Sequence, residues 1–244
     1  MRHPLHLVGW AIVFFGAFVV IPVHGDSRAA YFDLGTGVVT FVGVLTFFAV
    51  HLCATRPARC HAAGWMEAAV TSQAARTMAQ CIAALAPFTA ACLLLAVIDP
   101  IVGAWTGRSA DPGTLRLLGS AICVLGAALL AVAVSRWLRF LGAGVLVMVA
   151  VIAVSVWLGN NGAEPKQLLQ PAVDWASWDF TTAYGPFTGV VPGSPGWHDL
   201  YLTGWSALAL CAALLAHRRW RYPMLAGATA AAVLTVIAGS MQLP

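Results

Sequence analysis

The sequence predicts an all-α fold: a polytopic helical membrane protein of about seven transmembrane helices, with residues 1–244 forming a single transmembrane domain. First, 60% of the 244 residues are hydrophobic and only 9% are charged, whereas soluble domains carry about 25% charged residues. Second, the apolar residues occur in long unbroken runs, unlike the alternating segments of about ten residues that build membrane β-barrels. Third, basic residues gather in alternate connections between these runs, as the positive-inside rule requires.

Seven apolar runs approach the roughly 20 residues that a helix needs to cross the hydrocarbon core of a bilayer. They cover about 7–23, 34–54, 79–98, 115–134, 139–158, 200–216 and 223–241. The first run has the position of a signal peptide. However, Pro22, Val23 and His24 follow its core in place of a small-x-small cleavage site, so we expect a span there.

The distribution of basic residues predicts a cytoplasmic N-terminus and an external C-terminus. With this orientation nine of the 13 basic residues lie on the cytoplasmic side, together with only one acid, Glu67. Anionic lipid headgroups account for such a basic face, so no nucleic-acid partner is expected. The cytoplasmic basic residues are Arg2, Arg56, Arg59, Arg76, Arg136, Arg139, Arg218, Arg219 and Arg221.

Residues 55–78 form the main cytoplasmic connection. Within it, Gly64–Met78 has the pattern of an amphipathic helix, since Trp65, Met66, Ala69 and Val70 share one face. Such a helix either docks on a soluble partner or lies in the membrane interface.

Residues 159–199 form the long external segment. Connections beyond about 12–15 residues are usually functional or disordered, and its aromatic content argues against disorder. We expect short helices and loops that roof a cavity between the spans. The residues expected at this external gate are Trp175, Trp178, Tyr184, Trp197 and His198.

The stretch HLCATRPARCH, residues 51–61, raises the question of a metal site. His51, Cys53, Cys60 and His61 would supply four ligands if the chain reversed at Pro57. Their spacing matches no standard zinc motif, and two arginines in the loop would repel a dication. We expect the polar end of a span instead. No disulfides are expected, because the external segments contain no cysteine.

The sequence offers little for catalysis. Ser194, His198 and Asp199 lack the order and spacing of a known triad motif. Pro192, Gly193, Pro195 and Gly196 are instead typical of turns before the sixth span. No Asp, Glu or Lys falls in the middle of a predicted span, which argues against a proton-coupled carrier. The chain also lacks a phosphate-binding loop, so any energy from nucleotide hydrolysis must come from another chain.

Three stretches resemble a known family. VPGSPGWHDLYLTGWSALALCAALLAHRR resembles a run in actinobacterial ABC-transporter permeases of the type-2 exporter class, where Pro-Gly-Ser-Pro-x-Trp-His precedes a span. The tail AGATAAAVLTVIAGSMQL resembles the small-residue span that follows it. RPARCHAAGWMEAAVTSQAAR occupies the place of the family's arginine-rich turn and coupling segment.

The resemblance implies a permease in the plasma membrane of a bacterium, paired with a separate ATPase chain and with a second, identical or homologous permease. ATP and Mg²⁺ would bind the ATPase, and this chain would carry no cofactor and no catalytic residue. The implied coupling residues are Gly64, Trp65, Met66, Glu67 and Arg76. The alternative is a non-transporting membrane subunit with an assembly or sensing role, which would equally lack charges in mid-span. A membrane-embedded enzyme ranks below both.

Overall fold

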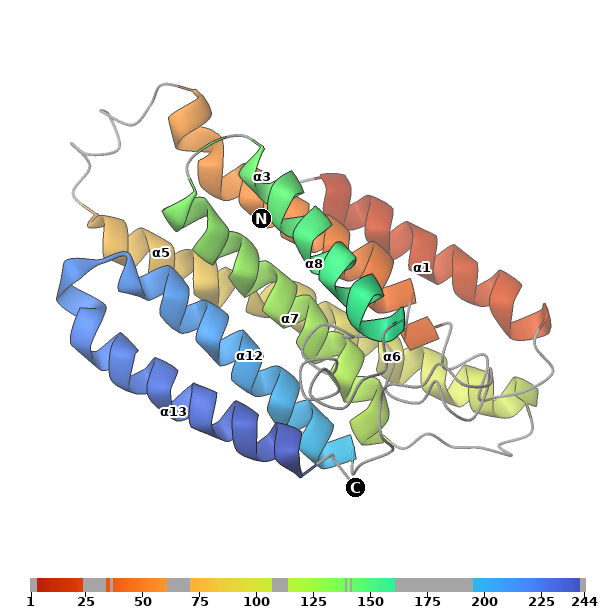
Figure 1. Cartoon of the computed structure of the whole chain (residues 1–244). Coiled ribbons are helices and arrows are strands. Elements are labelled where there is room, and N and C mark those ends of the chain that lie inside the picture. The colour runs from red at the N-terminus through yellow and green to blue at the C-terminus, as the bar shows by residue number, and fades with distance from the viewer. Residues whose placement is uncertain are drawn as a thin grey trace.

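A computed structural model describes residues 4–23, 34–35, 37–60, 71–106, 114–138, 140, 142–160 and 195–241. Throughout these residues the regular structure is helical, as predicted (Figure 1). The elements are α1 (Pro4–Val23), η1 (Val38–Gly43), α3 (Val44–Arg59), α5 (Gln73–Ala83), α6 (Leu85–Thr106), α7 (Thr114–Trp137), α8 (Ala143–Asn160), α12 (Pro195–Leu215), η2 (Arg218–Trp220) and α13 (Arg221–Ser240).

Among the described residues, five segments are long and apolar enough to cross a membrane. They are Val38–Arg56, Gln73–Ile101, Leu118–Trp137, Gly196–Leu215 and Arg218–Ser240, and each overlaps a predicted span. The predicted spans 7–23 and 139–158 fall on α1 and α8. Within α8 the described apolar stretch is shorter than these five segments and covers Ala143–Val154. These five helices are compatible with a protein that crosses the membrane several times.

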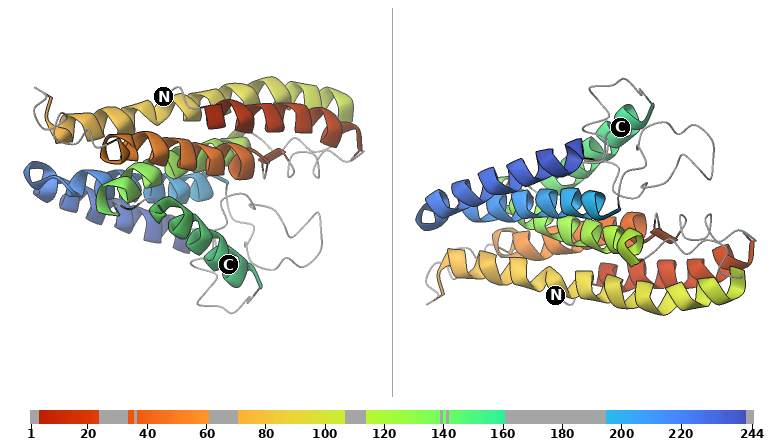
Figure 2. Two further views of the ribbon diagram at one scale, coloured as in Figure 1. Left: turned by 90° about the horizontal axis from the view of Figure 1, so that it is seen from above. Right: turned by 90° about the horizontal axis from the view of Figure 1, so that it is seen from below.

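The helices run back and forth between two ends of a bundle (Figure 1, Figure 2). The end of α3, the start of α5, the end of α7 and the turn between α12 and α13 lie at one end, which we call the basic end. The end of α6 and the starts of α7 and α12 lie at the opposite end, which we call the acidic end. The described acidic side chains, Asp99 and Asp199, belong to these last elements. The described basic side chains all belong to the basic end: Arg56, Arg76, Arg136, Arg218, Arg219 and Arg221.

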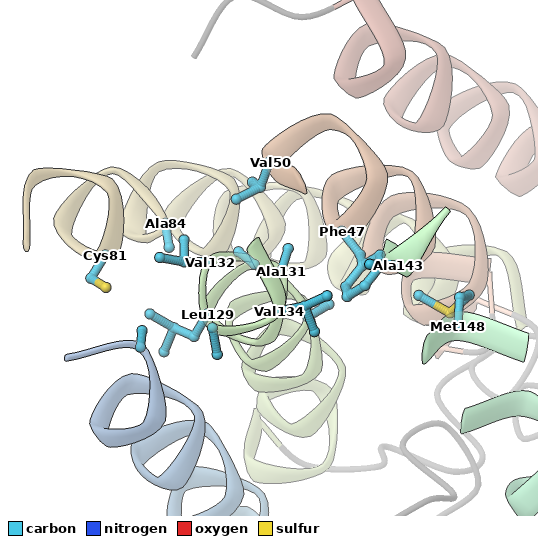
Figure 3. Close-up of a cluster of buried hydrophobic side chains, with 14 residues drawn as sticks. Phe47, Val50, Cys81, Ala84, Leu129, Ala131, Val132, Val134, Ala143 and Met148 are labelled. Atoms are coloured by element: carbon cyan, nitrogen blue, oxygen red, sulfur yellow. The ribbon is translucent and has the colours of Figure 1, made fainter. Parts of the chain in front are cut away.

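Helix α7 lies at the centre of the bundle, with α3, α6 and α12 packed around it. It is the most completely buried of the five candidate spans. Ala127, Ala128 and Ala131 leave almost no side chain in the way, so neighbouring backbones approach closely. Figure 3 shows the resulting cluster, in which Phe47 and Val50 of α3 meet Ala131 and Val132 of α7. Close packing of small residues is the expected source of stability where lipid removes the hydrophobic driving force between helices.

The first membrane helix after the cytoplasmic connection begins at Gln73, six residues before the predicted span 79–98 and within the predicted amphipathic helix Gly64–Met78. Thr71 and Ser72, which lie inside the predicted helix Gly64–Met78, are not helical, and α5 starts at Gln73; residues 64–70 lie outside the described residues. Ser72 is its N-cap, with the side-chain oxygen accepting a hydrogen bond from the Ala75 backbone N–H at 3.2 Å. Residues 73–78 therefore belong to the helix that continues through Ala84 into α6, rather than to a separate docking helix.

Two other helix boundaries differ from the prediction. Helix α3 continues through Pro57 to Arg59, where the sequence suggested an end at residue 54. Helix α12 starts at Pro195, where the sequence suggested turns up to Gly196 and a span from residue 200. Proline at the first helical position fits helix geometry, because the N–H that it lacks would have no partner there. The earlier start brings His198 and Asp199 inside the helical bundle.

Candidate functional site

A groove of about 520 Å³ lies between α7, α8 and α12. Helix α8 diverges from α12 toward the acidic end (Figure 2), and four of its residues line one wall of the groove. The groove is walled almost entirely by hydrocarbon. Its lining residues are Ile122, Cys123, Gly126 and Leu130 of α7, Val147, Ala150, Val151 and Val154 of α8, and Leu202, Trp205, Ser206, Leu208, Ala209 and Ala212 of α12.

The groove has a closed floor and an open side. A Cβ atom on Gly126 would lie 2.9 Å from Ser206 Oγ, so α7 and α12 touch where these residues meet. The Ser206 hydroxyl donates to the Leu202 carbonyl oxygen at 3.0 Å, which satisfies its proton within the helix. Trp205 at the groove is partly exposed, as are residues 149–154 of α8. A groove with these walls holds a hydrocarbon body and offers it few hydrogen bonds.

A buried carboxyl lies one helical turn beyond the groove toward the acidic end. Asp199 is only 7% exposed. A Cβ atom on Gly119 of α7 would lie 3.1 Å from Asp199 Oδ1 and 3.6 Å from Leu202 Cδ1, so Asp199 and a groove residue meet the same point of α7. Within the described part of the chain, Asp199 Oδ2 has no hydrogen-bond partner. A buried carboxylate is costly unless it is paired.

The basic end carries side-chain contacts that join three elements. Thr77 Oγ1 of α5 lies 2.8 Å from His217 Nε2, in the turn after α12. Since the Thr77 hydroxyl also donates to the Gln73 carbonyl oxygen at 3.0 Å, Nε2 of His217 is the donor to Thr77. Arg136 of α7 donates to Gln80 Oε1, and Trp137 Nε1 donates to the Ala212 carbonyl oxygen at 2.8 Å.

The pKa of His217 is lowered from its ordinary value of 6.5, first by burial and then by the positive charge of Arg136. Both causes disfavour the imidazolium form. His217 therefore acts as a neutral hydrogen-bond donor in this contact at neutral pH.

The residues considered for metal binding do not converge. His51 is 2% exposed, and its ring stacks on Phe47 with centroids 6.2 Å apart. Because α3 is helical as far as Arg59, His51 and Cys60 are separated by about 13 Å of helix axis. Cys53 is half-buried, Cys60 is exposed, and His61 lies outside the described residues. Among described residues no group of three or more His, Cys, Asp and Glu side chains forms a metal-binding cluster.

All six cysteines are described, and each is a free thiol. This agrees with the expectation that the chain forms no disulfide.

The predicted coupling and gate residues are only partly described. Arg76 lies in the first turn of α5 and is half-buried. Trp197 packs against the cluster formed by Ile122, Cys123, Tyr201, Leu202 and Ala238, and His198 is buried. Gly64, Trp65, Met66, Glu67, Trp175, Trp178 and Tyr184 lie outside the described residues, as do most of 159–199 and part of 55–78.

Sequence reasoning misplaced Asp199 and overlooked His217 and Thr77. Asp199 was assigned to the external segment because Gly193 and Gly196 read as turn residues. One signal was available: Asp199, Leu202, Ser206 and Ala209 recur at helical spacing, which places the carboxyl on an apolar stripe. Asp199 is the fourth residue of the candidate span Gly196–Leu215. It therefore lies inside a span but near its end, so the prediction that no Asp, Glu or Lys lies in mid-span does not extend to it.

Comparison with known proteins identifies no relative of this chain. No family model matches it, and no curated protein or solved structure does. The function must therefore be argued from the bundle itself.

Proposed function

We propose that this chain is the transmembrane permease subunit of an ATP-driven ABC exporter in the bacterial plasma membrane, energised by a separate ATPase chain. The observation that carries the proposal is the groove between α7, α8 and α12. A transport subunit needs a space that a solute can enter, and this space is apolar and flanked by α8, much of whose surface is exposed.

The charge distribution supports the orientation that this function requires. The described basic side chains belong to one end of the bundle and the described acids to the other. By the positive-inside rule the basic end faces the cytoplasm, which gives seven spans with a cytoplasmic N-terminus and an external C-terminus. The connection 55–78 then lies on the cytoplasmic side, where an ATPase would dock.

The mechanism proposed for this subunit is a change in helix arrangement driven from its cytoplasmic side. ATP and Mg²⁺ bind the partner ATPase. The closed ATPase then binds one of two helix arrangements of the permease more tightly than the other, which shifts the permease toward that arrangement. Helix α8 is the element suited to move, because its buried residues among those described, Ala143, Gly144 and Met148, lie near its start. A second copy of the chain, or a homologous permease, completes the transporter.

Transport by vesicles that contain this chain and its co-purifying ATPase tests the proposal. We expect ATP-dependent movement of a hydrophobic fluorescent dye, which Ala150→Phe blocks by filling the groove. Ala153→Phe is the matched control, since Ala153 is an exposed residue of α8 outside the groove lining. Both variants should retain the ATPase, whereas Glu67→Arg combined with Trp65→Ala should lose it.

Two outcomes would contradict the proposal. If the complex moves no dye with ATP, the non-transporting subunit becomes the better explanation. If the purified chain alone moves solute uphill on an ion gradient, the required energy does not come from an ATPase.

A further inference from the structure

The Asp199 carboxyl lies one helical turn from the groove-lining residue Leu202. On α12 the residues Asp199, Leu202, Ser206 and Ala209 follow one another at spacings of three and four, so they share a face of the helix. On α7, Gly119 precedes the groove-lining residues Ile122, Cys123 and Gly126 by three, four and seven positions, so it lies on the same face of the helix as they do. Leu202 contacts the Gly119 position and also lines the groove. The carboxyl therefore lies at one end of the apolar space, one turn beyond its lining.

The absence of a side chain at Gly119 brings Asp199 against the α7 backbone. A Cβ atom there would be 3.1 Å from Asp199 Oδ1, tighter than an ordinary contact. The carboxyl is thus held between two helices, while Oδ2 has no hydrogen-bond partner in the described residues. The described basic side chains, from Arg56 to Arg221, all belong to the opposite end of the bundle.

Charge complementarity decides which ligand head fits this place. A cation placed against Asp199 would offset the cost of burying the carboxylate, whereas an anion would add repulsion to it. An ammonium group donates hydrogen bonds or presents diffuse positive charge, and either satisfies a carboxylate oxygen. The adjoining groove, at about 520 Å³, is within the range of small-molecule sites and accepts a hydrocarbon body.

We infer that the groove binds cationic amphiphiles, with the hydrocarbon body between α7, α8 and α12 and the ammonium group at Asp199. As a statement about the exported substrate this rests on the proposed permease function. As a statement about binding it concerns this chain alone, and it is tested without an ATPase.

A pair of fluorescent probes that differ only in charge provides the test. Diphenylhexatriene and its trimethylammonium derivative share one apolar body, and energy transfer from protein tryptophans reports binding to the chain purified in an uncharged detergent. We expect the cationic probe to bind on the order of tenfold more tightly than the uncharged one, because its charge attracts the Asp199 carboxylate at short range.

Four variants locate the effect. Asp199→Asn should reduce the ratio of the two affinities to near one and leave the uncharged probe unaffected, and Asp199→Glu should keep the preference. Asp99→Asn is the matched control, because it removes the same charge from α6 at the same end of the bundle and should change nothing. Ala150→Phe should weaken the binding of both probes by the same factor. Size-exclusion profiles and melting temperatures exclude variants that fail to fold.

Equal binding of the two probes by the unmodified chain would overturn the inference. That result is expected if Asp199 pairs with a basic residue of the chain itself, such as Arg116, three residues before Gly119. A preference that survives in Asp199→Asn would overturn it too. Selective binding without ATP-driven transport would instead refute the permease function and leave the binding site in place.

Discussion

Helices α8 and α12 both pack on the central helix α7, but they are held in different ways. Helix α12 contacts α7 on one side and α13 on the other along most of its length. Helix α8 has its buried residues near the start, where Ala143, Gly144 and Met148 pack against the bundle. Farther along, Val149, Ile152 and Val154 are exposed.

This difference explains where the groove opens. A helix that is fixed on two sides cannot leave the bundle, whereas a helix that is anchored at one end can diverge at the other. The floor of the groove therefore comes from α7 and α12, and its width depends on α8. Substitutions at the contacts of α12 should change overall stability, and those at the anchor of α8 should change the groove.

The largest expected effect is at the contact between α12 and α13. A Cβ atom on Gly204 would overlap Thr235 Oγ1 and lie 3.3 Å from Thr235 Cα, so the two backbones would have to separate. Gly204→Ala should reduce the free energy of unfolding by about 1–3 kcal/mol, the usual cost of overpacking. Thermal unfolding in detergent measures this loss. Gly37→Ala is the control, because nothing lies within 4 Å of the added atom.

A smaller effect is expected at the anchor of α8. A Cβ atom on Gly144 would lie 2.8 Å from Cδ2 of His51, whose buried ring has little room to move. Gly144→Ala should cost about 1–2 kcal/mol and should alter the affinity of both fluorescent probes, because α8 forms one wall of the groove. In the control Gly142→Ala, the nearest atom to the new Cβ is 3.7 Å away. Unchanged stability and probe binding in Gly144→Ala would show that α8 is not anchored there.

The contact between α5 and the turn after α12 should contribute less. Thr77→Val removes the hydroxyl that accepts from His217 Nε2 at 2.8 Å. We expect a loss of about 1 kcal/mol in the free energy of unfolding, typical of one hydrogen bond. Thr89→Val is a comparison, since its hydroxyl donates only to carbonyl oxygens of its own helix. Equal losses in the two variants would argue against a stabilising contact with His217.

The smallest expected effect is a dependence of stability on pH through His217. Its pKa is lower in the folded protein than the ordinary value of 6.5, so the unfolded chain binds a proton more readily. Stability should therefore be complete above about pH 6.5 and decrease as the pH falls toward the folded pKa. His217→Gln should flatten this part of the profile of melting temperature against pH. A profile that matches that of the unmodified protein would assign the dependence to other groups.

The fold class was predictable from composition, because the composition indicates whether water or lipid surrounds the chain. A chain with 9% charged residues cannot cover a soluble surface, and long apolar runs need helices to satisfy their backbone groups in lipid. Five of the seven predicted runs correspond to helices long and apolar enough to cross a membrane. The boundaries were less predictable. Pro57 suggested a turn but lies inside α3, and Pro195 suggested a turn but begins α12.

The candidate site was only partly predictable. The sequence predicted Trp197 and His198 at an external gate, which stays a prediction; both pack on the helical bundle, but neither is among the residues that line the groove. It did not place Asp199 in the bundle, because a five-residue shift in one helix start decides whether that carboxyl is external or buried. His217 and Thr77 are 140 residues apart, and no local pattern could pair them.

The sequence by itself determined that this chain is helical, that it belongs in a bilayer and that its basic residues gather on one side, since each follows from local composition and solvent. Only the tertiary structure decided which faces meet: that α12 is held on two sides, that α8 diverges to open a groove, and that Asp199 lies against Gly119 at its end. The reason is physical. Apolar helices are nearly interchangeable in lipid, so the arrangement depends on steric fit between small residues on helices far apart in the chain.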